Sequence, residues 1–192
     1  MKIQSAEFLI GAASPGQFPS SSLPEVAFAG KSNVGKSSLI NVLVNRKRLV
    51  KTSSTPGKTR QINFFLINQA FRLADLPGYG FARAPKAEQA SWQQLVETYL
   101  QEGQFLQGVV LIVDCRHAPG PLDQQMVTWL NAFQRPHLVV ANKIDKLKRS
   151  QISAQMEKLR KGLGLASDPL PFSAQTGAGK PELLRAMGEW MR

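Results

Sequence analysis

A glycine-rich segment between an apolar stretch and a helix-like stretch constrains this chain more than any other feature. Residues 26–29 are apolar and β-like, and residues 30–37 read GKSNVGKS. Glycines at both ends let backbone amides turn inward and surround phosphate oxygens at a helix N-terminus. The spacing G-x-x-x-x-G-K-S in this context predicts a phosphate-binding loop, with a plain Gly-rich turn as the alternative. Its members are Gly30, Lys31, Ser32, Asn33, Val34, Gly35, Lys36 and Ser37.

Two side chains of this loop carry its expected chemistry. Lys36 would place its ammonium group on the β- and γ-phosphates of a nucleotide, and Ser37 would give its hydroxyl to Mg²⁺. We therefore take Lys36 as a catalytic candidate and Ser37 as a metal ligand.

The pattern of apolar stretches predicts an α/β fold. The expected strands cover residues 6–12, 26–29, 62–67, 71–74, 109–113, 137–141 and 170–172. The expected helices cover residues 37–46, 87–102, 121–133, 150–162 and 181–191. Only residues 68–70 separate the third strand from the fourth, which predicts a hairpin rather than a helical crossover.

Elsewhere strands and helices alternate, which predicts three layers: helices on both faces of a mostly parallel sheet with one antiparallel hairpin at its edge. We expect one domain over residues 1–192. Within it, residues 1–21 form an N-terminal strand and connector, and residues 22–192 form the nucleotide-binding body.

A second motif follows the fourth expected strand. It consists of Asp75, Leu76, Pro77 and Gly78. An Asp at a strand end suits water-mediated contact with Mg²⁺, and the Gly78 amide can reach a γ-phosphate, which makes Gly78 a second catalytic candidate. D-x-x-G alone is a weak signal, but one hairpin after a phosphate loop it becomes specific.

A third motif predicts which base is bound. It consists of Asn142, Lys143, Ile144 and Asp145 after the strand expected at 137–141. The Asp145 carboxylate can accept hydrogen bonds from guanine N1–H and the exocyclic amine, whereas adenine would leave it unpaired. A helix N-cap is the alternative role for Asp145 alone. A weaker fourth segment, Phe172, Ser173 and Ala174, would offer a backbone amide to guanine O6. The motifs together predict a P-loop NTPase of the small GTPase type, a G domain.

A Ser/Thr/Gly/Pro-rich loop at residues 52–60 lies between the first two motifs. Such a loop suits a segment that orders on γ-phosphate and Mg²⁺ and loosens after hydrolysis, although an idle surface loop would look similar. We take Thr59 as the second protein ligand of Mg²⁺ and a catalytic candidate, with Thr55 as its competitor.

Basic residues are in excess and cluster beside this loop. The chain has 24 Lys and Arg against 13 Asp and Glu, a net charge of +11, which favours a polyanionic partner such as nucleic acid. One cluster comprises Arg46, Lys47, Arg48, Lys51, Lys58 and Arg60, and we favour rRNA contact for it. A second comprises Lys146, Lys148, Arg149, Lys158, Arg160 and Lys161, for which a solvated helix face serves equally well.

Composition also bears on the compartment. The longest apolar run is about six residues, far short of a membrane span, so we expect no membrane partner. A single cysteine, Cys115, excludes an internal disulfide and fits a reducing compartment. We therefore expect a cytoplasmic protein, and we expect a monomer.

Three segments resemble the EngB (YihA/YsxC) family of bacterial ribosome-biogenesis GTPases. They read GKSNVGKSSL at 30–39, TPGKTRQIN at 55–63 and DLPGYGFA at 75–82. The resemblance spans nearly the whole chain. It implies GTP, GDP and Mg²⁺ binding through residues 30–37, 75–78, 142–145 and 172–174, together with Gly57, Lys58, Thr59, Arg60 and Gln61. Ser37 and Thr59 would lie on the metal. It also implies association with the large ribosomal subunit and its rRNA during assembly, and a link to septation and cell division.

Two features qualify the expected mechanism. Tyr79 stands where many GTPases have a water-orienting Gln, so we expect intrinsic hydrolysis at or below about 10⁻⁴ to 10⁻³ s⁻¹. Tyr79 and Phe81 could instead contact a partner. In several related assembly GTPases an Asn at the position of Asn33 coordinates K⁺, while turn chemistry favours Asn there equally well. The alternative functions are a nucleotide-gated RNA-binding placeholder with negligible hydrolysis, and a P-loop ATPase or kinase.

Overall fold

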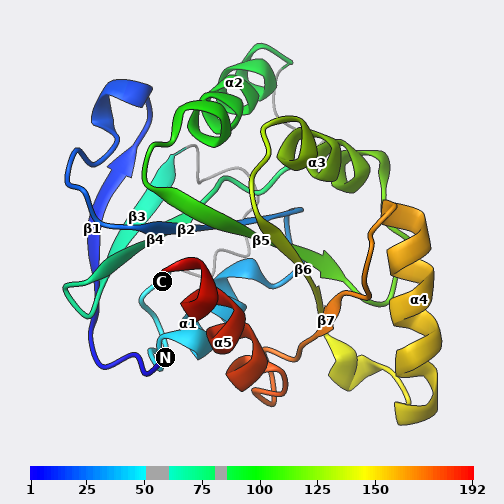
Figure 1. Ribbon diagram of the computed structural model, residues 1–192. Helices are drawn as coiled ribbons and strands as arrows, with labels where there is room; N and C mark the ends of the chain where they lie inside the picture. The colour runs from blue at the N-terminus through cyan, green and yellow to red at the C-terminus, as the bar shows by residue number, and fades with distance from the viewer. Residues whose placement is uncertain (51–60, 81–85) are drawn as a thin grey trace.

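A seven-stranded sheet runs through the described part of the protein, in the order β1-β3-β4-β2-β5-β6-β7 (Figure 1). The computed structural model describes residues 1–50, 61–80 and 86–192, without the side chains of residues 86–89 and 92. The strands are β1 (Ala6–Ala12), β2 (Glu25–Gly30), β3 (Ile62–Ile67), β4 (Phe71–Asp75), β5 (Leu106–Asp114), β6 (His137–Asn142) and β7 (Leu170–Pro171).

The sheet is mostly parallel, which confirms the predicted fold class. β2 pairs in parallel with β4 and β5, and β5, β6 and β7 continue in parallel. β3 runs antiparallel to β4, as the predicted hairpin requires. The hairpin is not the edge of the sheet, however, because β1 pairs antiparallel with β3, from Ala6 opposite Ile67 to Ala12 opposite Ile62. The N-terminal strand thereby supplies partners to backbone groups of β3 that an edge strand would leave open.

The helices cover both faces of the sheet. They are α1 (Lys36–Leu43), α2 (Lys86–Glu102), α3 (Pro121–Ala132), α4 (Ile152–Leu163) and α5 (Lys180–Trp190), with 3-10 segments at Pro15–Gln17, Ile144–Lys146 and Arg149–Gln151. Within the described residues, no helix is both long and apolar enough to cross a membrane.

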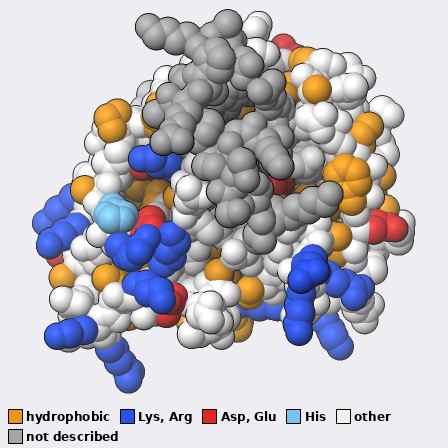
Figure 2. All heavy atoms as spheres, turned by 180° about the vertical axis from the view of Figure 1, so that it is seen from behind, with side chains coloured by type: hydrophobic (Ala, Val, Ile, Leu, Met, Phe, Trp, Pro, Cys, Tyr) orange, Lys and Arg blue, Asp and Glu red, His pale blue; other side chains and the backbone are white. Residues whose placement is uncertain are grey.

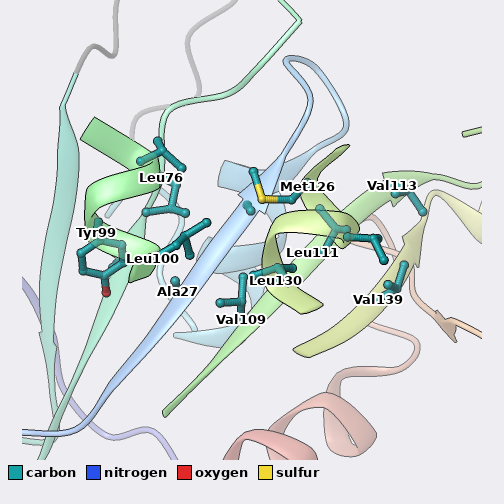
Figure 3. Close-up of a cluster of buried hydrophobic side chains, with 14 of the residues drawn as sticks. Ala27, Leu76, Tyr99, Leu100, Val109, Leu111, Val113, Met126, Leu130 and Val139 are labelled. Carbon is teal, nitrogen blue, oxygen red and sulfur yellow. The ribbon is translucent and has the colours of Figure 1, made fainter. Parts of the chain in front are cut away.

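Alternate residues of the central strands divide the core into two layers. Ala27 of β2 and Val109 of β5 pack with residues of α2, α3 and α4 (Figure 3). Phe28 and Val110, their neighbours in sequence, pack on the opposite face with α1 and α5. This two-sided burial explains why these strands are apolar throughout, as expected for parallel strands covered on both faces.

Helix α1 is shorter than the sequence pattern predicts. It ends at Leu43 instead of residue 46, and Asn45 adopts a φ of +54°. The Lys180 ammonium, from the start of α5, donates to the Val42 carbonyl at 2.5 Å and to Asn45 Oδ1 at 2.6 Å. A cation at a helix C-terminus satisfies carbonyls that lack helical partners. The left-handed Asn45 ends α1 locally, and Lys180, far away in the sequence, adds hydrogen bonds at that end.

A buried polar network fixes the N-terminal connector to the sheet. Arg72 of β4 has 0% exposure, and its Nε donates to Glu25 Oε1 of β2 at 2.7 Å. Its terminal nitrogen donates to the carbonyls of Ser21 and Leu23 at 2.8 and 3.0 Å. The Tyr99 hydroxyl of α2 donates to Glu25 Oε2 at 2.7 Å. Both carboxylate oxygens of Glu25 thus have donors, as a buried charge requires.

Candidate nucleotide site

The predicted phosphate loop occupies the turn from β2 into α1. Its two outer glycines are sterically required. A Cβ on Gly30 would lie 2.8 Å from the Ile112 carbonyl oxygen of the neighbouring strand β5. Gly35 has a φ of +93°, and a Cβ there would lie 2.5 Å from Asn142 Nδ2. The loop therefore packs against β5 and against the end of β6.

Lys36, the first residue of α1, forms an ion pair with Asp75, the last residue of β4. Their side chains are only 11% and 3% exposed. Phe28 of β2 and Asp75 are register partners in adjacent parallel strands, which brings the carboxylate beside the phosphate loop. The sequence placed these two residues in separate motifs, and the sheet brings them together.

The oxygen donors here fit Mg²⁺. Ser37 is the second residue of α1, one position after Lys36, and Asp75 supplies a carboxylate that pairs with Lys36. Magnesium prefers hard oxygen ligands such as hydroxyl and carboxylate groups. The second predicted ligand, Thr59, lies outside the described residues, as do its competitor Thr55 and the neighbouring Gly57, Lys58 and Arg60. Gln61 is described and is exposed just before β3.

The D-x-x-G segment lies against the phosphate loop, as its predicted role requires. The Ser32 amide donates to the Tyr79 carbonyl at 2.9 Å, and a Cβ on Gly78 would lie 3.1 Å from Ser32 Oγ. Leu76 and Pro77 are buried, and the Leu76 amide donates to the Phe28 carbonyl at 3.0 Å. Gly78 is thereby held within contact distance of the loop.

Tyr79 is partly buried, which does not fit the role of an exposed aromatic contact for a partner. Its ring is partly buried against the core, and its hydroxyl donates to Asp123 Oδ1 of α3 at 2.8 Å. Burial, and then the neighbouring Asp123 carboxylate, raise the pKa of Tyr79 well above its ordinary value. A residue held in this way is not an exposed aromatic contact for a partner. Phe81, named with it, lies outside the described residues.

Asn142 joins three segments of the site. Its Nδ2 donates to the Val34 carbonyl of the phosphate loop at 2.9 Å. Its Oδ1 accepts from the Ala174 amide after β7 at 3.1 Å. The amide expected to reach guanine O6 therefore already has an acceptor, so that contact requires the Ala174 hydrogen bond to be shared or exchanged.

The Asp145 carboxylate is oriented by Ser173. Asp145 Oδ1 accepts from Ser173 Oγ at 2.7 Å, and both Ser173 and the preceding Phe172 are fully buried. Ser173 Oγ in turn accepts from the Gln175 and Thr176 amides at 3.2 and 3.1 Å. The Ser173 hydrogen bond lowers the pKa of Asp145. The carboxylate therefore stays ionised and able to accept hydrogen bonds, while Ile144 packs on the core.

Lys143 reaches back to the phosphate loop. Its ammonium donates to the Asn33 carbonyl at 2.8 Å and to Asp114 Oδ2 of β5 at 2.8 Å. Asn33 is exposed with a φ of +67°, a conformation that Asn tolerates better than most residues. Asp114 and its partner Arg116 were missed from the sequence. The available signal was a carboxylate directly after a buried apolar strand, the same signal that identified Asp75.

The comparisons with known proteins agree with this geometry. A family model described as "50S ribosome-binding GTPase" matches residues 25–143. The "Probable GTP-binding protein EngB" of Desulforamulus reducens is 50% identical over 100% of this chain and 95% of its own length. The protein of the same name from Pelotomaculum thermopropionicum is 51% identical, over 100% and 98%. A crystal structure of "a probable GTP-binding protein engB" superposes with a TM-score of 0.76 at 27% identity, covering 88% of this chain and 98% of its own. The chain belongs to the EngB family of GTP-binding proteins, and its nucleotide-binding fold is that of a GTPase.

Proposed function

We propose that this protein binds GTP and GDP with Mg²⁺, hydrolyses GTP slowly, and acts in the cytoplasm as an assembly factor for the large ribosomal subunit. One observation carries the nucleotide part: Asn142 bonds to both the phosphate loop and the Ala174 segment. The parts suited to phosphate and to base therefore form one connected site at the carboxyl ends of parallel strands, where such sheets bind ligands.

Guanine is the base that this site suits. An ionised Asp145, oriented by Ser173, can accept from guanine N1–H and the exocyclic amine. Adenine offers neither donor at that edge and would leave a carboxylate unpaired, which is costly. This argues against the ATPase or kinase alternative. Isothermal titration with GDP and ADP tests it, and equal affinities would refute the guanine assignment.

In the hydrolytic site, Lys36 would neutralise charge on the β- and γ-phosphates, while the Gly78 amide would donate to the γ-phosphate. Ser37 and Thr59 would hold Mg²⁺, which supplies charge neutralisation on the phosphate oxygens when bound. The assignments of Lys36, Ser37 and Gly78 are supported by their place around one loop, and that of Thr59 stays a prediction from the sequence.

The slow rate follows from Tyr79. Its hydroxyl is engaged by Asp123, and an aromatic ring cannot orient an attacking water as a Gln does. This observation also favours the second candidate, an RNA-binding placeholder with negligible hydrolysis. Hydrolysis assays with and without large ribosomal subunits separate the two. Stimulation by the subunit identifies a GTPase, whereas an unchanged and negligible rate identifies a placeholder.

Potassium is a further candidate cofactor through Asn33. Asn33→Gly separates the two roles of this residue, because glycine keeps the positive φ but removes the side-chain amide. If Asn33 binds K⁺, hydrolysis is faster in K⁺ than in Na⁺, and the variant loses that difference. If Asn33 only forms the turn, the two ions give equal rates in both proteins.

The RNA surface is proposed for the first basic cluster. Arg46, Lys47 and Arg48 are exposed after α1, and Lys51, Lys58 and Arg60 lie outside the described residues. The second cluster is partly neutralised, since Lys161 pairs with Glu157 at 2.7 Å and Arg160 with Asp168 at 3.0 Å. Figure 2 shows Lys and Arg side chains gathered in separate groups on one face of the molecule. The first cluster adjoins, in sequence, the loop expected to respond to nucleotide, so it is the better candidate for an RNA contact that responds to nucleotide.

Co-sedimentation with large ribosomal subunits tests the partner, in the presence of a GTP analogue, GDP or no nucleotide. Replacing Arg46, Lys47 and Arg48 by Ala should weaken binding and reduce its salt dependence, because fewer counterions are released. The matched control replaces Lys148, Arg149 and Lys158, three exposed cations of the second cluster, and should bind as the wild type does. Equal losses in both variants would refute a specific surface. Depletion in cells should give subunit precursors and the septation defect that the family resemblance implies.

A further inference from the structure

Asp114 lies at the base end of the site, at a position given by strand register. It is the last residue of β5, and its register partner in the parallel strand β6 is Asn142. The Cys115 amide donates to the Asn142 carbonyl at 3.0 Å and fixes the two strand ends together. Lys143, the first residue after β6, therefore emerges beside the Asp114 carboxylate.

Both oxygens of Asp114 are occupied by cationic or amide donors. Arg116 donates through Nε to Oδ1 at 2.9 Å and through a terminal nitrogen to Oδ2 at 2.7 Å, and so forms a bidentate ion pair. The Arg116 amide adds a third bond to Oδ1 at 3.1 Å, and the Lys143 ammonium adds a fourth to Oδ2 at 2.8 Å. Paired charged hydrogen bonds of this kind fix geometry more firmly than single neutral ones.

The hydrogen bond to Asp114 restricts the side chain of Lys143. Its side chain must cross from the base-binding segment to the phosphate loop, where it donates to the Asn33 carbonyl at 2.8 Å. A free lysine side chain samples many rotamers, and holding it extended costs conformational entropy. Asp114 provides a second anchor for the same ammonium. Its negative charge also offsets the repulsion between two cations, since Lys143 and Arg116 both donate to its Oδ2.

We propose that Asp114 is a positioning residue for guanine-nucleotide binding, which it supports by fixing Lys143 across the site, and that Arg116 holds Asp114 in place. This inference rests on the proposed guanine-nucleotide site. Asp114 and Arg116 need not touch the nucleotide, because they act through the lysine.

The test is the affinity for GDP, measured by isothermal titration on the full chain. Asp114→Asn keeps the shape of the side chain but removes its charge, so we expect GDP to bind about 10-fold more weakly. Arg116→Ala should cost less, about threefold, because the Arg116 side chain is 41% exposed and its pair with Asp114 is partly solvated.

A double-mutant cycle distinguishes positioning from general structural support. If Asp114 acts through Lys143, the double variant Asp114→Asn/Lys143→Met binds GDP no more weakly than Lys143→Met alone. A merely structural role would give losses that multiply. Should Asp114→Asn not fold, the cycle of Arg116→Ala with Lys143→Met asks the same question, and thermal unfolding without nucleotide reports the folding of each variant.

The matched control is a second Arg–Asp pair, Arg160 with Asp168. Asp168 precedes β7 and so lies toward the amino ends of the parallel strands, whereas Asp114 lies at the carboxyl end of β5. Arg160→Ala and Asp168→Asn should leave GDP affinity unchanged. Unaltered GDP affinity in Asp114→Asn, or multiplying losses in the cycle, would overturn the positioning role. A wild-type protein without preference for GDP over ADP would instead overturn the proposed function, so the two failures are distinguishable.

Discussion

The hydroxyl group of Tyr79 donates to Asp123 Oδ1 at 2.8 Å and thereby joins the segment after β4 to helix α3. Asp123 is the third residue of α3, and its Oδ2 accepts from the Gly120 amide at 2.9 Å at the start of that helix. One carboxylate therefore both caps α3 and holds Tyr79. The contact therefore links the D-x-x-G segment to the start of α3.

Tyr79→Phe tests whether this hydroxyl is structural or catalytic. We expect a loss of unfolding free energy of roughly 1–2 kcal/mol, because the variant removes a hydrogen bond to a charged, mostly buried acceptor. The intrinsic hydrolysis rate should stay close to that of the wild type, since the hydroxyl faces Asp123 rather than the phosphate loop. Urea unfolding and single-turnover hydrolysis measure the two quantities. A large loss of rate without a loss of stability would assign the hydroxyl to catalysis.

The two tyrosines, Tyr79 and Tyr99, should both resist ionisation in the folded protein. Burial, followed by the nearby Glu25 carboxylate, raises the pKa of Tyr99 well above 10.0, as burial and Asp123 do for Tyr79. The unfolded chain releases these protons first, so stability falls as pH rises above 10.0. Tyrosinate absorbance should therefore appear together with alkaline unfolding. A tyrosine half-ionised at pH 10.0 in the folded protein would contradict this.

The sequence predicted those parts of the site whose chemistry is local. The phosphate loop needs Gly30 and Gly35 at fixed spacing, and Asp75 and Asn142 each end an apolar strand, so pattern alone located all four. Contacts between distant segments were not predictable in this way. The donors to Asp114 and the pairing of Tyr79 with Asp123 depend on strand register and on helix placement, which no short motif encodes.

For the fold, too, local features were predictable from the sequence and contacts between distant segments were not. Alternation of strands and helices predicted a mostly parallel sheet, because each strand is buried on both faces by its flanking helices. It did not predict that β1 would pair with β3, because the apolar pattern of β1 does not indicate which strand of the sheet it joins. It also placed the end of α1 three residues too late, because Asn45, inside the predicted helix, adopts a left-handed conformation.

Arg72→Ala should be among the most destabilising single changes. It leaves the buried Glu25 carboxylate without its cation, which costs about 3–5 kcal/mol when a buried pair is broken. Burial already raises the pKa of Glu25, so the variant should recover part of the loss on acidification as Glu25 takes up a proton. Urea unfolding at several pH values measures this.

The control for that change is Arg160→Ala, which removes a pair with Asp168 whose side chains are 34% and 51% exposed. Solvated pairs contribute little, so the expected loss is below about 1 kcal/mol. Similar losses in the two variants would show that Arg72 contributes no more than a surface charge.

Gly35→Ala should abolish nucleotide binding as well as reduce stability. The residue has a φ of +93°, and an added Cβ would lie 2.5 Å from Asn142 Nδ2, so either the loop or Asn142 must move. Asn142 is bonded to both Val34 and Ala174, and its displacement would separate the phosphate loop from the base site. Titration with GDP and urea unfolding measure both effects.

Gly164→Ala separates backbone strain from this steric effect. Gly164 ends α4 with a φ of +64°, but a Cβ there would meet nothing within 4 Å. Its substitution should cost about 1–2 kcal/mol of stability from the left-handed conformation alone and leave GDP affinity unchanged. If Gly35→Ala lost no more than Gly164→Ala in stability and still bound GDP, the contact with Asn142 would not govern the site. A loss of binding confined to Gly35→Ala would mean that the loop and the base site depend on the same close approach.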